Sequence, residues 1–221
     1  MKKLDHDTAL SVTAIHNNNI DIPNRELYLC GEEAEWCEGD EPGVNHDMAI
    51  RLLRNLRILD GHDHAPILIH MKTCGGDWIE GMAIYDMIKA CVSPVTILSY
   101  THARSMSSII LQAADFRVLM PNSYFMYHHG SYGIEGDWQS VMSNVEWDKK
   151  CEKTMFEIYA ECMVTTKHGK YYRQDADKVI RMMKRQMDSK TDVFFTAQET
   201  VECGLADAVF DGNWVALREY E

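Results

Sequence analysis

The sequence predicts an α/β domain in which most strands are parallel. Short apolar runs typical of strands alternate with helical segments through the middle of the chain. That alternation requires parallel strands joined by right-handed crossovers. The chain has 221 residues, of which 46% are hydrophobic, and this is enough for the core of one domain. Active sites in such folds lie where the strands end.

The first 24 residues are polar and rich in asparagine and aspartate, and we expect an irregular N-terminal arm over residues 1–24. The main domain is then expected over residues 25–221. Within it, residues 26–30 are a short strand candidate. The acidic, turn-rich segment 31–43 is expected to be a solvated loop.

The alternating part of the chain follows. Apolar residues recur at helical spacing from Met48 to Leu59 and predict a helix that Asp60-Gly61 ends. The next run is apolar enough for a strand that is buried on both faces. The elements expected here are helix 45–59, strand 67–71, helix 77–90, strand 95–99, helix 106–114, strand 116–120 and strand 124–127.

A long helix is predicted over about residues 137–163, with Met155, Ile158 and Tyr159 on one face. A helix of roughly 25 residues is long for a compact domain. It either projects toward another subunit or covers the core. The remaining expected elements are helix 175–186, a polar turn over 188–192, an apolar run at 194–196, a short helix opened by a Thr196–Glu199 capping box, and strand 205–210.

Charge and composition exclude several classes of protein. Lysine and arginine number 22 and aspartate and glutamate 34, so the net charge is 22 − 34 = −12. This argues against nucleic acid or an anionic membrane as the main partner. No apolar run approaches the roughly 20 residues that span a bilayer, and we expect no signal peptide. The seven cysteines form no Cys-x-x-Cys pair, which favours a reducing, cytoplasmic location.

We predict neither a metal nor a cofactor. The pattern His62-Asp63-His64 is a candidate for metal binding, but it lies in a turn rich in glycine and aspartate. No obvious partner ligands accompany it, so we interpret it as a solvated loop.

Three features follow strand candidates and predict one site. Ser105 stands between the strand at 95–99 and a helix. A serine at such a turn can be a nucleophile, but it is more often simply a helix cap. Gly75-Gly76 and His128 also come directly after strands. Because the carboxyl ends of parallel strands meet at one edge, we expect these residues to lie together.

Serine chemistry needs a base, an orienting acid and an oxyanion site. His128 is the natural base; His129 could substitute, but neighbouring side chains on an extended chain point opposite ways. Gly75-Gly76 permits close approach of the backbone, and the Met106 N–H would be a second oxyanion donor, although composition alone favours a helix-initiating turn for the glycines. The residues alone leave five acids open: Asp115, Asp137, Asp188, Asp192 and Asp207.

Four segments resemble the proteolytic subunit of the ATP-dependent Clp protease, over roughly residues 26–210. They are Cys74-Gly75-Gly76 with Gly81–Asp86, Ala103–Met106, Leu119–His128, and Met187–Glu199. The family counterparts are Ser-Pro-Gly-Gly with Gly-x-Ala-Ile-Tyr-Asp, Ala-Ala-Ser-Met, Leu-Pro-Asn-Ser-x-x-Met-x-His, and a segment that begins Arg-Asp-Thr. The chain differs from the family pattern at Cys74, Arg104, Ser107 and His129-Gly130.

The resemblance implies a serine endopeptidase that degrades unfolded polypeptides through an acyl-enzyme. Ser105 would be the nucleophile, His128 the base and Asp188 the acid, with the Gly75 and Met106 N–H groups as the oxyanion hole. The implied fold is a repeated ββα spiral, which crotonases share, and the long helix would be the projecting handle. The implied partners are an AAA+ unfoldase and further copies of the chain, in two stacked heptameric rings.

Two other functions stay open. A crotonase-like acyl-CoA enzyme would share the spiral and a two-amide oxyanion hole, but it does not need the Ser/His/Asp set. A non-catalytic ring subunit would fit the unusual neighbours of the site, Arg104 and Cys74. We predict that the Arg104 side chain points away from the site.

Overall fold

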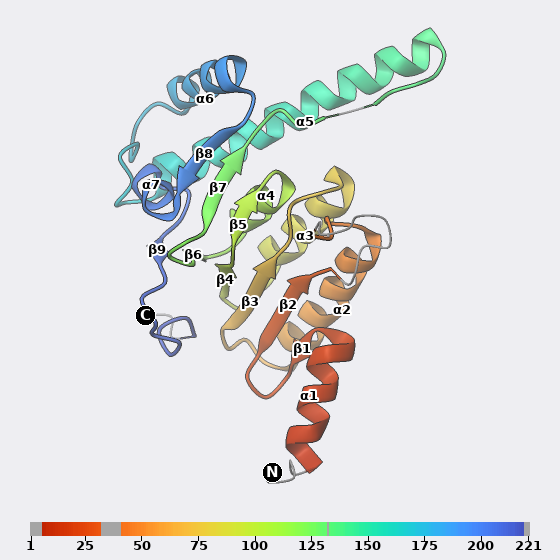
Figure 1. Cartoon of the computed structure of the whole chain (residues 1–221), viewed down its shortest axis with the longest axis vertical. Helices are drawn as coiled ribbons and strands as arrows, with labels where there is room; N and C mark the ends of the chain where they lie inside the picture. The colour runs from red at the N-terminus through yellow and green to blue at the C-terminus, as the bar shows by residue number, and fades with distance from the viewer. Residues whose placement is uncertain (1–5, 32–40, 132, 219–221) are drawn as a thin grey trace.

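A six-stranded sheet runs through the centre of the molecule (Figure 1). The computed structural model describes residues 6–31, 41–131 and 133–218. The strand order is β1-β2-β3-β4-β6-β9, and every neighbouring pair is parallel except β1 and β2. The strands are β1 (Ile20–Asp21), β2 (Glu26–Cys30), β3 (Ile67–Lys72), β4 (Val95–Ser99), β6 (Phe116–Leu119) and β9 (Ala208–Val209). The predicted parallel α/β fold is confirmed.

A second, three-stranded sheet carries the segments that matter for the site. It has the order β5-β7-β8, with β5 (His102–Arg104), β7 (Tyr124–Tyr127) and β8 (Val193–Thr196). β5 pairs with β7 in parallel, whereas β7 pairs with β8 antiparallel. In that second pairing Tyr127 lies opposite Val193. The residues just beyond these two, His128 and Asp192, therefore face each other across the end of the sheet.

Three helices cover one face of the large sheet: α2 (His46–His62), α3 (Trp78–Lys89) and α4 (Met106–Leu111). Alternate strand residues such as Ile69 and Ile97 point toward them, because successive side chains on a strand point to opposite faces. Leu68 and Leu98 point to the other face and pack against Phe210 and Leu217 of the C-terminal segment. The predicted helices and strands of this region are confirmed to within a few residues.

Helix α5 (Trp138–Thr165) has 28 residues and extends well beyond both sheets (Figure 1). Its buried residues all lie in its second half: Met155, Phe156, Ile158, Tyr159, Ala160 and Met163. One half therefore covers the core, as one alternative predicted, and the other half projects beyond the sheets; its packing against another subunit stays a prediction. The chain continues through α6 (Ala176–Lys190) and α7 (Ala197–Cys203), and the predicted capping box of Thr196 and Glu199 is present.

We predicted an irregular N-terminal arm over residues 1–24, and this prediction is wrong. Residues 6–18 form helix α1 (His6–Asn18), and β1 pairs with β2. Asparagine tolerates the left-handed conformation that ends many helices, and Asn19 has φ 57° with its N–H bonded to the Ile15 carbonyl. The asparagine run thus ends a helix and lets the chain enter the sheet. Residues 1–5, and most of the acidic 31–43 segment, lie outside the described residues.

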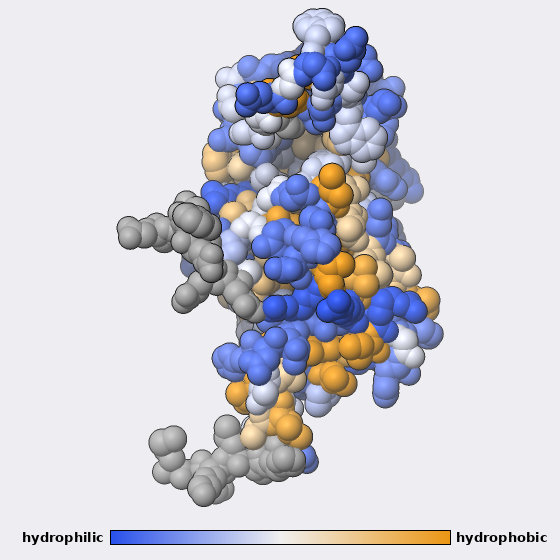
Figure 2. All heavy atoms as spheres, turned by 90° about the vertical axis from the view of Figure 1, so that its right-hand side faces the viewer, coloured by the Kyte–Doolittle hydropathy of each residue, from blue (hydrophilic) through white to orange (hydrophobic). Residues whose placement is uncertain are grey.

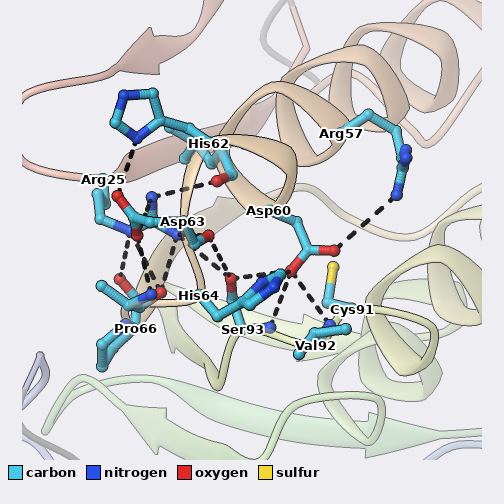
Figure 3. A network of polar contacts seen from close by, with 12 residues as sticks. Arg25, Arg57, Asp60, His62, Asp63, His64, Pro66, Cys91, Val92 and Ser93 are labelled. Carbon is cyan, nitrogen blue, oxygen red and sulfur yellow. Dashed lines mark hydrogen bonds and ion pairs between the residues drawn. The ribbon is translucent and has the colours of Figure 1, made fainter.

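The His62-Asp63-His64 segment belongs to a structural network (Figure 3). Arg25 pairs with Asp63 at 2.9 Å, and its guanidinium also donates to backbone carbonyls of the same loop. Nearby, the buried Asp60 carboxylate accepts from the Val92 N–H at 3.1 Å, the Ser93 N–H at 2.8 Å and the Ser93 hydroxyl at 2.9 Å. Within the described residues, no group of three or more His, Cys, Asp or Glu side chains could hold a metal ion.

The outer surface of α2 and α3 mixes charged and apolar side chains (Figure 2). Leu53 and Ile58 on α2 are exposed, and Ile79 at the start of α3 is 70% exposed. Single exposed apolar residues are ordinary on soluble folds, but Ile79 also borders the cleft described below. None of the helices in the described part of the chain is long and apolar enough to cross a membrane.

We expect Asp60→Asn to reduce the free energy of unfolding by about 1–3 kcal/mol at neutral pH, because the carboxylate accepts three buried hydrogen bonds. The Ser93 N–H, and then the Ser93 hydroxyl and Val92 N–H, hold the Asp60 pKa below its ordinary value of 3.8. A depressed pKa stabilises the fold above the unfolded pKa, and that stabilisation is lost as the pH falls through the folded pKa. Urea unfolding at pH 5 and pH 3 should show a smaller stability loss in the variant, and an equal loss would contradict this account.

Candidate active site

Ser105 occupies a strained turn between β5 and α4. Its φ of 52° and ψ of −131° lie outside the regions that side-chain-bearing residues ordinarily adopt. Such conformations cost about 1–3 kcal/mol and occur mostly at functional sites. The Ser105 side chain makes no capping hydrogen bond to α4. Ser105 therefore occupies the N-cap position of the helix, but its hydroxyl is not used as a cap and is directed elsewhere.

Two further serines hold this turn in place. Ser107 Oγ accepts from the Arg104 N–H at 2.9 Å and donates to the Arg104 carbonyl at 2.8 Å. Ser108 Oγ donates to the Ser105 carbonyl at 2.6 Å and lies 2.7 Å from the hydroxyl of Tyr159 on α5. Both serines are fully buried. Side chains of α4 and α5 thus fix the backbone that presents Ser105.

His128 lies beside Ser105, as predicted. Its Nε2 is 2.9 Å from Ser105 Oγ, within hydrogen-bond distance. The two residues come from the ends of neighbouring strands, since β5 pairs with β7 and the Ser105 N–H donates to the Met126 carbonyl at 3.2 Å. This is the arrangement that a histidine needs to remove a proton from a serine hydroxyl.

The carboxylate at the other side of His128 belongs to Asp192, which corrects the choice of Asp188. Asp192 Oδ1 is 3.2 Å from His128 Nδ1. Asp188 Oδ1 lies 3.7 Å from Nε2 of the next residue, His129. The other predicted candidates have structural roles. Asp115 accepts from the Val95 N–H, Asp137 caps α5, and Asp207 pairs with Arg117.

The local backbone explains why Asp192 reaches His128. The predicted polar turn over 188–192 begins too early, because α6 continues to Lys190 and keeps Asp188 in its last turn. The chain then reverses at Thr191, with φ 62° and ψ −67°, where the Asp192 N–H bonds to the Lys190 carbonyl at 2.7 Å. These angles describe a classic γ-turn, a rare and strained conformation. Only the antiparallel register of β7 and β8 identifies Asp192, and this register cannot be known from the sequence before the pairing of the two strands is known.

The predicted oxyanion donors lie next to each other. A Cβ on Gly75 would sit 2.7 Å from Ser105 Cβ and 2.8 Å from the Met106 nitrogen, so only glycine fits at its φ of 97°. The Gly75 carbonyl accepts from the Val44 N–H at 2.5 Å. Gly76 lines the cleft beside Ser105. The Gly76 N–H, which we did not predict as a donor, is therefore a candidate alongside those of Gly75 and Met106.

The same segment also starts a helix, as the alternative interpretation proposed. The Asp77 carboxylate caps α3 by accepting from the Glu80 N–H at 2.9 Å. The glycines therefore have two roles: they approach the serine turn closely, and they lead the chain into α3.

A cleft of about 590 Å³ opens beside Ser105 and His128. It runs between the start of α3, the serine turn and the helix α5. Ile109, Met155 and Tyr159 give it a buried, apolar inner part. Its remaining side chains include carboxylates and tryptophans: Asp77, Asp148, Glu152, Trp78 and Trp147. The cleft is therefore suited to a chain segment that places an apolar side chain inward.

Two other reactive side chains do not compete with Ser105. Cys151 lines the cleft, but burial raises the pKa of its thiol, and a protonated thiol is a poor nucleophile. Arg104 is not among the residues that line the cleft, and its side chain lies beside Cys74 and Tyr124. This agrees with the expectation that Arg104 points away from the site.

Comparisons with known proteins agree on one family. The family model described as Clp protease matches residues 41–213. An ATP-dependent Clp protease proteolytic subunit from Deinococcus radiodurans is 29% identical over 171 residues, 76% of each chain. ATP-dependent Clp protease proteolytic subunit 2 from Treponema denticola is 28% identical over 191 residues, 85% of this chain and 82% of the relative.

A solved structure shows the same fold. A mutant ClpP1 from Listeria monocytogenes superposes with a TM-score of 0.68 over 89% of this chain and 96% of its own, at 19% identity. The spiral fold that the resemblance implied is thereby confirmed.

We expect the two aspartates to differ sharply as variants. Asp192→Asn should slow the labelling of Ser105 by a fluorophosphonate by about 10⁴-fold, because His128 loses the group that fixes its tautomer. Asp188→Asn should change the rate by at most about fivefold, as for other exposed ion pairs. Single-turnover labelling of both variants tests this assignment. The reverse order of effects would restore Asp188 as the orienting acid.

Arg104→Ala should leave the labelling rate unchanged, since its side chain lies outside the cleft. The measurement is the same labelling assay, run with a thermal unfolding scan to separate lost activity from lost stability. A large fall in rate with an unchanged melting temperature would show that the cation acts on the oxyanion.

Proposed function

The chain belongs to the Clp protease family and is a serine-type endopeptidase, and we propose that Ser105, His128 and Asp192 carry out its chemistry. One observation carries this assignment. Ser105 Oγ, His128 Nε2, His128 Nδ1 and Asp192 Oδ1 form a continuous chain of contacts of 2.9 and 3.2 Å. The contacts begin at a serine that is held in a strained turn and does not cap its helix.

Acylation begins when His128 Nε2 removes the proton from Ser105 Oγ as this oxygen attacks the carbonyl carbon of the substrate. The carbonyl oxygen then carries the negative charge of the tetrahedral intermediate. His128 returns the proton to the amide nitrogen as the carbon–nitrogen bond breaks, and the amine leaves. A water molecule attacks the resulting acyl-serine by the same route and regenerates Ser105.

Two groups of residues around the serine lower the activation barriers of acylation and deacylation. Asp192 holds His128 with Nε2 toward the serine and stabilises the imidazolium that forms. The N–H groups of Gly75 or Gly76, together with that of Met106, would bind the oxyanion. Each such donor contributes about 2.7–4 kcal/mol in a site that excludes water. Gly75 cannot be replaced here without a clash against the serine turn.

The substrates proposed are unfolded polypeptides, supplied by an AAA+ unfoldase. Support comes from the relatives, whose names describe ATP-dependent protease subunits, and from a cleft open to an extended chain. We also propose that copies of the chain assemble into two stacked heptameric rings. The projecting half of α5, which exposes Trp138 and Trp147, would be available for such contacts.

The cytoplasm is the proposed location. Six cysteines in the described residues are free: Cys30, Cys74, Cys91, Cys151, Cys162 and Cys203. Free thiols are typical of a reducing compartment.

Ser105→Ala tests the proposal. The variant should lose fluorophosphonate labelling and peptide cleavage, yet keep its free energy of unfolding within about 0.5 kcal/mol, because no cap is removed. Ser131→Ala is the matched control, since this exposed serine lines the same cleft. Native mass measured on the same samples reports the assembly. Wild-type protein that assembles but neither labels nor cleaves short peptides would refute the proposal and favour a non-catalytic ring subunit, whereas retention on immobilised CoA would favour a crotonase-like enzyme.

A further inference from the structure

His129, the residue after the proposed base, contacts carboxylates from two different helices. Its Nδ1 is 2.5 Å from Glu152 Oε1 on α5, and its Nε2 is 3.7 Å from Asp188 Oδ1 at the end of α6. The ring also lies edge-on to the buried Phe156, with 6.4 Å between centroids. Glu152 thus lies within hydrogen-bond distance of the ring, whereas Asp188 lies just beyond that distance on its other side.

The end of β7 is joined to the segment that carries the acid at three successive residues. The Tyr127 hydroxyl donates to Gln186 Oε1 at 2.6 Å, His128 contacts Asp192, and His129 contacts Asp188. Two of these contacts reach the last turns of α6, at Gln186 and Asp188, and the third reaches Asp192 in the turn before β8. The contact of His129 with Glu152 adds the helix that forms the opposite wall of the cleft.

We infer that His129 is a positioning residue of the active site. Together with Glu152 and Asp188 it forms a set of contacts, which we call the His129 clamp, that ties α5 and the end of α6 to the segment carrying His128. The clamp keeps Asp188 on His129, so that Asp192 alone faces His128 Nδ1. This inference rests on the proposed function, because it assumes that His128 is the base.

The geometry favours this role over direct participation in the reaction. The structure pairs both ring nitrogens of His129 with carboxylates, and Nε2 of His128, not of His129, faces Ser105 Oγ. Loss of the clamp should therefore act through the placement of His128. Misplacement of a catalytic group by about 1 Å can cost about 10²-fold in rate.

A double-mutant cycle on the full-length protein tests the inference. His129→Ala should lower kcat for a short fluorogenic peptide by about ten- to a hundredfold, and His129→Gln, which keeps one donor, should recover most of that loss. Glu152→Gln should lower kcat in wild-type protein but have little further effect in the His129→Ala background, because residues of one network are not additive. Asp188→Asn, whose contact with His129 is longer and exposed, should lower kcat by no more than about fivefold, and only where His129 is present. His46→Ala, which breaks a contact of 3.1 Å with Glu80 between two residues that do not line the cleft, should leave kcat unchanged.

The outcomes separate the two proposals. Active wild-type protein with additive effects of His129→Ala and Glu152→Gln, or with an unchanged kcat in His129→Ala, would overturn the clamp alone. A fall in activity that His129→Gln fails to recover, or that His46→Ala reproduces, would also overturn it. Wild-type protein without labelling or cleavage would overturn the proposed function and the clamp with it.

Discussion

The antiparallel pairing of β7 with β8 is the constraint on which the site depends. Because Tyr127 lies opposite Val193, His128 and Asp192 meet where the two strands end. The parallel pairing of β5 with β7 then brings Ser105 to the other side of the same histidine. Three residues that are far apart in the sequence thus become neighbours through two strand registers. A shift of one residue in either register would turn these side chains to the opposite face.

Buried polar contacts from the six-stranded sheet fix the ends of the helices that pack around the site. Arg117 on β6 is buried and binds Asp207 through two hydrogen bonds of 2.9 and 2.8 Å. The same guanidinium reaches Gln112 at the end of α4, Thr166 at the end of α5 and the Gly204 carbonyl at the end of α7. A buried cation requires such complete pairing, since removal of one partner leaves an uncompensated charge. One side chain therefore fixes the ends of three helices, among them the two that support the serine turn.

The sequence was informative where the chemistry follows the ends of strands. Ser105, His128 and the glycine pair each follow a strand candidate, so their meeting could be inferred without a structure. The acid could not, because Asp188 and Asp192 lie within one polar stretch and only the strand register distinguishes them. The resemblance selected Asp188, which the extension of α6 directs to His129 instead. The N-terminal helix was missed for a related reason: an asparagine run is typical of loops, yet a single asparagine in the left-handed conformation also ends a helix.

Ser105 and Thr191 share one property, a positive φ in a residue that carries a side chain. Neither conformation improves the folded state, and each persists because the surrounding contacts fix it. Mutations that relax these turns should increase the free energy of unfolding but reduce the activity. Among related chains, the positive φ at these two positions should therefore distinguish active members from inactive ones. Copies that have lost the reaction are free to adopt an ordinary backbone at these two positions, whereas copies that keep it are not.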